Sequence, residues 1–356
     1  MKKSTVARIA GIILLFAVIC WAVWLHLPTF QPGLLNAGDD HIHVAFSNEL
    51  DRIWSETDTL LGWSRLYGPG APIFLLRPPG FYFTVALLHQ LLPLTIEEAL
   101  KFIVLLGFCL FPLTVYLGAR LLEFSSRTAV FAGLLAPLPI SLWGHTIDAY
   151  QYLGIHKQLL AILIFPLAVG ALWQLLKNGK CGPLFAITFP FIFITHPYIA
   201  YCYTMLAPCM IISLAAIESH WHWRQGIFQS IIWSIPAFLF LCIWLVQFTA
   251  SPEIQVIEPY IGRRDAFEVI VCTLSETLRQ YFLGGLLDTT RFSGPLGGVL
   301  WTEGNEWGWL SNSEYLIFPL LTLLSVIGLI IALARPKSAN RGFLGLSFFL
   351  GIILFT

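Results

Sequence analysis

The sequence predicts an all-α protein: a polytopic bundle of about 9–10 transmembrane helices with a large first extracytoplasmic loop, each span needing about 20 apolar residues. Hydrophobic residues make up 57% of the 356-residue chain and charged residues only 11%, and the mean hydropathy is +0.76. Long apolar runs recur along the chain. Too little polar surface exists for a soluble domain of this length, and a formal net charge of zero gives no reason to expect a nucleic-acid partner.

The N-terminal element is predicted to be a membrane anchor over residues 1–30. An apolar run over residues 9–27 is long enough to span a bilayer, and it is preceded by Lys2, Lys3 and Arg8. No small-residue cleavage site follows the run, which favours an uncleaved anchor over a signal peptide. Because positive residues tend to stay inside, we expect a multi-pass protein of the cell membrane with a cytoplasmic N-terminus.

Residues 31–79 form the largest polar region and are predicted to be an extracytoplasmic loop. The region holds six acidic and three basic residues. Residues 41–61 have helical character, whereas residues 62–79 are rich in Gly and Pro, which favour turns. We therefore expect one or two short helices along the membrane surface, followed by an irregular segment.

The rest of the chain is predicted to form a transmembrane bundle over 80–249, a second extracytoplasmic loop over 250–314 and C-terminal transmembrane helices over 315–356. The first apolar run of the bundle, residues 80–93, is too short for an ordinary span. A re-entrant or surface helix is the favoured interpretation, and a tilted crossing is the alternative. The chain ends inside an apolar run, so we expect a longer protein with further helices.

This topology gathers polar residues on the outer side of the membrane. The outer pieces are the loop 31–79, the connection 144–157, the turn at His196 and Pro197, and the loop 250–314. Such a distribution favours an enzyme whose site lies at the outer surface. A transporter is instead expected to carry its polar groups near the middle of several spans.

The densest polar motif, residues 38–43, directly follows the anchor and reads Gly-Asp-Asp-His-Ile-His. If a helix begins here, Asp39 and His43 share a face at i,i+4, and Asp40 and His43 are spaced i,i+3. A carboxylate here suits a general base, and the three side chains Asp39, Asp40 and His43 also suit a divalent cation such as Mg²⁺ or Mn²⁺. The alternative is a capped surface helix with solvated charges.

A second group of candidate residues consists of basic side chains that are predicted to lie at the membrane surface. Arg77 lies near the end of the Gly/Pro-rich segment and suits either snorkelling or pairing with a phosphate. Phe81 and Tyr82 beside it are more typical of an interfacial aromatic belt than of a sugar platform. His156 and Lys157, at the start of a predicted span, suit a lipid-linked phosphate and an ordinary loop equally.

His196 interrupts a long apolar stretch and is followed by Pro197. The proline disfavours a continuous helix, which predicts a tight turn. A histidine at this depth needs a partner. Both a structural role and a place in the site are consistent with that need.

The order of these motifs resembles the GT-C superfamily of multi-spanning glycosyltransferases, in which an acidic pair opens the first outer loop. A closer resemblance is to bacterial and archaeal membrane proteins labelled 6-pyruvoyl-tetrahydropterin synthase-related. The resemblance spans residues 1–215 and is carried by residues 38–43, WSRLYGPGAP over 63–72, RPPGFY over 77–82, and His196-Pro197. This chain departs from the family pattern at His41, an extra histidine, and at Arg77, where an aromatic residue is expected.

The resemblance implies transfer of a sugar from a polyprenyl-phosphate donor to an acceptor glycan, lipid or protein at the outer leaflet, with inversion at the sugar carbon. Asp39 would be the general base, and Asp40 and His43 would orient it or hold a metal. Candidates for binding the donor phosphate would be Arg77, His156, Lys157 and His196. The alternatives are a transporter or flippase of lipid-linked sugars and a non-catalytic membrane scaffold.

Overall fold

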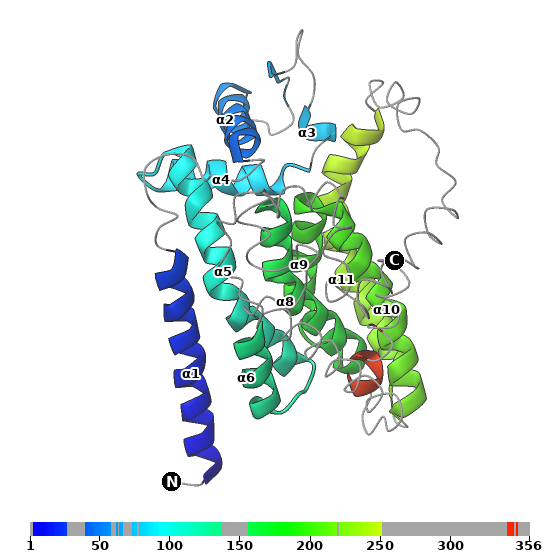
Figure 1. Cartoon of the computed structure of the whole chain (residues 1–356). Coiled ribbons are helices and arrows are strands. Elements are labelled where there is room, and N and C mark those ends of the chain that lie inside the picture. The colour runs from blue at the N-terminus through cyan, green and yellow to red at the C-terminus, as the bar shows by residue number, and fades with distance from the viewer. Residues whose placement is uncertain are drawn as a thin grey trace, which may run out of the picture. The chain divides into compact units, whose positions relative to one another are not determined.

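The computed structural model describes residues 3–26, 40–57, 62, 64–66, 73–76, 78–136, 156–218, 221–250, 340–344 and 347. These residues form helices joined by turns, with no strand among them. The helices, drawn in Figure 1, are α1 (Lys3–His26), α2 (Asp40–Thr57), α3 (Ile73–Leu76), α4 (Gly80–Leu91), α5 (Ile96–Leu121), α6 (Ser126–Leu135), α8 (His156–Asn178), α9 (Gly182–Thr195), α10 (Pro197–Ile217) and α11 (Trp223–Ala250).

The chain divides into two compact units. The first holds residues 1–215 and 219–258, and the second holds residues 216–218 and 259–356. Of the second unit, the structure describes only 216–218, 340–344 and 347. The predicted second outer loop and C-terminal helices therefore lie almost wholly outside the described residues.

Within the first unit the long helices run up and down a bundle. We call the end that holds α2 and α4 the upper end, as it is drawn in Figure 1, and the opposite end the lower end. α5 and α8 run from the upper end to the lower end, and α9 and α11 run back. Short connections enforce this antiparallel order, because only four residues join α5 to α6 and three join α8 to α9.

α5 and α8 approach each other closely at Gly118. A Cβ added to Gly118 would lie 2.5 Å from the carbonyl oxygen of Pro166 in α8. A backbone oxygen cannot swing aside as a flexible side chain can, so the contact requires glycine. Small residues at such crossings allow spanning helices to pack at short range. The contact fixes α8, the helix that begins with His156, against α5.

Two helices of the described part are long and apolar enough to cross a membrane, namely α5 and α8. Large apolar side chains also point outward from α1 and α11, among them Phe16, Trp24, Phe228 and Phe238. Extended apolar surfaces of this kind are rare on soluble proteins and suit contact with lipid tails. These features support membrane association, and the predicted number of spans stays a prediction.

The first apolar run of the predicted bundle forms α4, which is 12 residues long. At 1.5 Å per residue its length is about 18 Å, whereas the hydrocarbon core of a bilayer is about 30 Å thick. In Figure 1, α4 lies across the upper ends of α5 and α8. This length and position agree with a re-entrant or surface helix. A helix that crossed the bilayer at a tilt would have to be longer than α4.

α2 covers α4 through an apolar stripe. Phe46, Leu50 and Ile53 are spaced i, i+4 and i+7, and none is more than 2% exposed. They belong to one hydrophobic core with Phe81 and Tyr82 of α4, which are fully buried. The predicted aromatic belt is therefore wrong for these two residues. Because α2 covers the first turn of α4, the two rings face the core instead of the membrane surface.

Candidate functional site

A buried hydrogen-bonded pair joins the first residues of two helices at the upper end. α2 begins at Asp40, and α8 begins at His156. The Nε2–H of His156 donates to Oδ1 of Asp40, and the two side chains are 0% and 2% exposed. A carboxylate this far from water needs such a donor, because a buried charge without a partner is strongly unfavourable. The pair therefore ties together two helix starts that are 116 residues apart in the chain.

Aromatic rings enclose the pair. The ring centroids of His43 and His156 are 5.5 Å apart, and Phe81 stacks on His156 with a centroid separation of 6.4 Å. The Tyr82 hydroxyl lies 3.3 Å from Nδ1 of His43, within hydrogen-bond distance. Rings on several sides restrict the rotation of both imidazoles, so their nitrogen atoms are held in set directions.

The sequence of α2 explains why Asp40 and His43 face this side. His43 lies on the buried stripe that continues through Phe46 and Leu50, since residues three and four apart share a helix face. Asp40 occupies the first turn, where the helix dipole favours a carboxylate. The Ser47 hydroxyl donates to the His43 carbonyl oxygen at 2.8 Å, which satisfies a hydroxyl that is also buried.

Lys157 brings a positive charge to the edge of this cluster. Its Nζ lies 5.6 Å from the centroid of the Tyr82 ring, which is within cation–π range. Its side chain is only half-buried, in contrast to that of His156. Lys157 is therefore the more accessible of the two basic residues that the sequence singles out at the start of α8.

The predicted break at His196 and Pro197 is confirmed. α9 ends at Thr195, His196 is extended with φ −153° and ψ 92°, and α10 begins at Pro197. The half-buried His196 ring uses Nδ1 to accept a hydrogen bond from the backbone N–H of Ile199 at 3.4 Å. Its predicted need for a partner is thus met by the first turn of α10.

The same turn lies against the start of α4. A Cβ added to Gly80 would lie 2.7 Å from Oγ1 of Thr195 and 3.0 Å from the carbonyl carbon of Ile194. Glycine at this position therefore lets α4 approach the end of α9. The His196 turn thus contacts α4, and α4 in turn contacts the cluster around Asp40 and His156. His196 itself lies outside that cluster, between α9 and α10.

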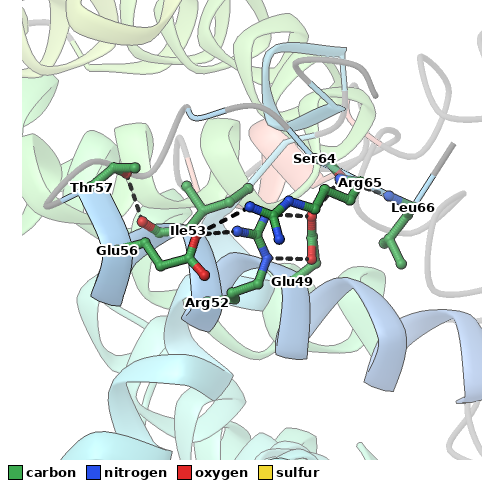
Figure 2. A network of polar contacts seen from close by, with 8 residues as sticks. All are labelled: Glu49, Arg52, Ile53, Glu56, Thr57, Ser64, Arg65 and Leu66. Atoms are coloured by element: carbon green, nitrogen blue, oxygen red, sulfur yellow. Dashed lines mark hydrogen bonds and ion pairs between the residues drawn. The ribbon is translucent and has the colours of Figure 1, made fainter. Parts of the chain in front are cut away.

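A second polar network, shown in Figure 2, lies on α2 away from the buried pair. Glu49 accepts two hydrogen bonds from Arg52, at 3.0 and 2.8 Å, and one from the backbone N–H of Arg65 at 2.6 Å. Arg52 also pairs with Glu56. The hydrogen bonds from Arg52, followed by those from Arg65 and Ser64, lower the pKa of Glu49 below its ordinary value of 4.5 although burial opposes them.

This network fixes the short segment 64–66 to α2. Sequence reasoning did not single out Glu49, although its i,i+3 spacing to Arg52 is a local signal for a helical ion pair. The contact with Arg65 could not be predicted in that way, because it joins residues 16 positions apart.

The structure brings together four of the residues that the sequence singled out: Asp40, His43, His156 and Lys157. Asp39 and Arg77 lie outside the described residues, so their proposed roles stay predictions. His156 was expected to bind a donor phosphate, but its Nε2 is occupied by Asp40. Phe81 and Tyr82 were not predicted as part of this cluster, because the sequence alone does not reveal that α2 covers α4.

The predicted site for Mg²⁺ or Mn²⁺ rests on Asp39, Asp40 and His43. Within the described ranges, no three His, Cys, Asp or Glu side chains gather in a way that could hold a metal ion. Asp40 and His43 are instead engaged by His156 and Tyr82. Because Asp39 is not described, metal binding by this set stays a prediction.

The arrangement of the helices is similar to that in a solved structure, the archaeal oligosaccharyltransferase AglB from Archaeoglobus fulgidus in complex with an inhibitory peptide and a dolichol-phosphate. The TM-score is 0.53 at 15% sequence identity, and the match covers 96% of this chain and 47% of that chain. The chain thus spans about half the length of that structure.

No family model and no curated protein matches the sequence. The likeness to AglB therefore supports the predicted GT-C fold, while the narrower resemblance to the 6-pyruvoyl-tetrahydropterin synthase-related proteins stays a prediction.

Proposed function

We propose that this protein is a membrane glycosyltransferase that moves a sugar from a polyprenyl-phosphate donor to an acceptor at the upper end of the bundle. One observation carries the proposal: Asp40 of the acidic motif meets His156 at the start of α8, at one end of a fold that resembles an oligosaccharyltransferase. The dolichol-phosphate in that relative is a lipid-linked phosphate, which fits a donor of the same chemical class here.

The proposed reaction is an inverting displacement. The acceptor hydroxyl oxygen attacks the anomeric carbon of the sugar while the bond from that carbon to the phosphate oxygen breaks. The polyprenyl phosphate leaves with the bonding electron pair, and Asp39 takes the hydroxyl proton as general base. Asp40 and His43 orient the motif. The donor phosphate meets Lys157 and Arg77, because cationic side chains bind phosphate oxygens by charge-assisted hydrogen bonds, and it accepts a further hydrogen bond from the Nε2–H of His196.

Charge distribution supports an outward orientation of the upper end. Basic residues gather at the lower end, among them Arg120, Arg127, Lys177, Lys180 and Arg224. Positive residues are typical of the cytoplasmic side, so the lower end and the N-terminus of α1 face the cytoplasm in this proposal. The Asp40–His156 cluster then faces the outer leaflet, where a lipid-linked donor presents its sugar.

The test is sugar transfer in membranes that contain the full chain, with radiolabelled polyprenyl phosphate-mannose and polyprenyl phosphate-glucose as probes and the membrane's own glycans, lipids and proteins as acceptors. Asp39→Asn should lower transfer by about 100-fold or more, because general-base catalysis contributes that much. Asp51→Asn, an acid on α2 that binds Gln90, is the matched control and should keep near-normal transfer.

Two outcomes would contradict the proposal. If the folded Asp39→Asn variant transferred sugar at the wild-type rate, Asp39 could not be the general base. Translocation of the labelled lipid across reconstituted vesicles, with no new glycosidic bond, would favour the flippase alternative.

A further inference from the structure

We propose that His156 is a positioning residue: it holds the Asp40 carboxylate and thereby sets the start of α2, with the acidic motif, on the spanning helix α8. This inference rests on the proposed glycosyl transfer. His156 acts through Asp40 rather than on the donor phosphate, the role for which the sequence made it a candidate.

The contacts of the His156 ring carry the inference. Nε2 faces Oδ1 of Asp40, and the side chain is 0% exposed. Nδ1 is also buried and has no hydrogen-bond partner among the described residues. This pattern assigns the proton to Nε2, because an N–H at Nδ1 would have no acceptor there. The ring thus directs its donor at Asp40 and presents no accessible nitrogen to a lipid headgroup.

The surroundings of the ring keep that donor in place. Phe81 stacks on one side of His156, and the His43 ring approaches from α2. Phe81 belongs to the hydrophobic core that joins α2 to α4, and His43 lies on the buried face of α2. A shift of His156 would therefore disturb the packing of α2 on α4 as well as the hydrogen bond to Asp40. These contacts favour one arrangement of α2, α4 and α8.

The position of Asp40 bears directly on the proposed base. Asp39 is covalently bonded to Asp40, and consecutive Cα atoms are about 3.8 Å apart, so anchoring Asp40 limits where the preceding residue can lie. A catalytic group that is displaced by about 1 Å can lose about 100-fold in rate. His156 is thus expected to affect the rate of transfer more than the binding of the donor.

Two substitutions of similar polarity test this role. In His156→Gln the amide nitrogen lies near the former Nε2 and can still donate to Asp40, whereas in His156→Asn it lies nearer the former Nδ1 and falls short. His156→Asn should lower kcat by about 100-fold with little change in KM for the donor, and His156→Gln should restore most of kcat. His89→Gln is the matched control, since His89 also approaches an α2 carboxylate, Asp51, at 3.9 Å; it should transfer normally.

The kinetic pattern separates positioning from phosphate binding. A raised KM for the polyprenyl phosphate-sugar with unchanged kcat would overturn the inference and return His156 to the donor site. Equal loss of kcat in His156→Gln and His156→Asn would also overturn it, because reach to Asp40 would then be irrelevant.

A second readout separates this inference from the proposed function. Amide hydrogen exchange in the first turns of α2 should be about tenfold faster in His156→Asn than in the wild type, and near normal in His156→Gln. If the wild type transfers no sugar from either probe, the proposed function fails, and this exchange difference alone decides whether His156 positions α2. Unchanged exchange in His156→Asn would overturn the positioning role.

Discussion

The two ends of the bundle join helices by polar contacts of opposite character. At the upper end, the Asp40–His156 pair is shut away from water behind aromatic rings. At the lower end, Lys177 of α8 pairs with Glu123 at 2.6 Å, and these side chains are 21% and 36% exposed. Polar contacts between helices can therefore have two different roles. A buried pair specifies one geometry, whereas an exposed pair adds a weak contact that water or another side chain can replace.

The lower end holds further polar contacts of the same partly exposed kind. Glu123 also lies 3.4 Å from Nε2 of Gln174 and 3.3 Å from Nδ2 of Asn178, and Gln174 donates to the carbonyl oxygen of Leu121. Nearby, the indole N–H of Trp221 donates to the carbonyl oxygen of Leu176 at 2.9 Å. At the lower end, several partly exposed contacts thus join α8 to neighbouring segments. At the upper end, the contact between Nε2 of His156 and Asp40 is buried.

The largest expected effect is on stability when the buried pair is broken. His156→Leu leaves the Asp40 carboxylate buried without this donor, so the free energy of unfolding should fall by about 3–5 kcal/mol. Equilibrium unfolding of the purified protein in mixed micelles, followed by helix content, measures this change.

The double variant Asp40→Leu/His156→Leu is the control for that measurement. Removing both partners leaves no uncompensated charge, so the double variant should be more stable than His156→Leu alone. Equal stability of the single and double variants would mean that the burial of Asp40 does not depend on His156, and the contrast between the two ends would fail.

The features that could be predicted from the sequence are local or follow from overall topology. The turn at His196 was predictable because Pro197 restricts the residue before it. The helix that starts at Asp40 was predictable from the pattern that follows it, and the position of Asp40 and His156 on the same side of the bundle followed from counting spans and charges. Each of these inferences needs only neighbouring residues, or a count of apolar spans and charges along the chain.

The partners within the site could not be predicted in this way. Asp40 and His156 meet only because α2 lies over α4 and against the start of α8, a packing choice that no local pattern encodes. The same packing buries Phe81 and Tyr82, which the sequence alone suggested for the membrane surface. Glu49 was overlooked for a related reason, since its contact with Arg65 depends on how the segment after α2 folds back.

The Glu49 network should show an intermediate effect that depends on pH. Because Arg52 lowers the pKa of Glu49 in the folded protein, the unfolded chain takes up a proton first as the pH falls below about 5. The stabilisation is therefore complete near neutral pH and is lost as the pH falls through the lowered pKa. Glu49→Gln should reduce the free energy of unfolding by roughly 1–2 kcal/mol near neutral pH, and its difference from the wild type should shrink in acid.

Glu56→Gln is the matched control, because Glu56 pairs with the same arginine but is half exposed. Its effect should be smaller than that of Glu49→Gln. Unfolding curves of the three proteins across the acidic range would show this order. A difference between the wild type and Glu49→Gln that does not change with pH would mean that the carboxylate charge does not hold the segment 64–66.

The smallest effect is expected at the lower end, from Lys177→Gln. The pair with Glu123 is partly exposed and is backed by Gln174 and Asn178, so its loss should change the free energy of unfolding by less than about 1 kcal/mol. Added salt should remove most of that difference, because exposed charges are screened, while it should leave the effect of His156→Leu largely intact. The same unfolding assay at low and high salt measures both. A salt-insensitive loss in Lys177→Gln as large as that in His156→Leu would show that the two ends are held in the same way, and burial would no longer explain why the upper end is the better candidate for the site.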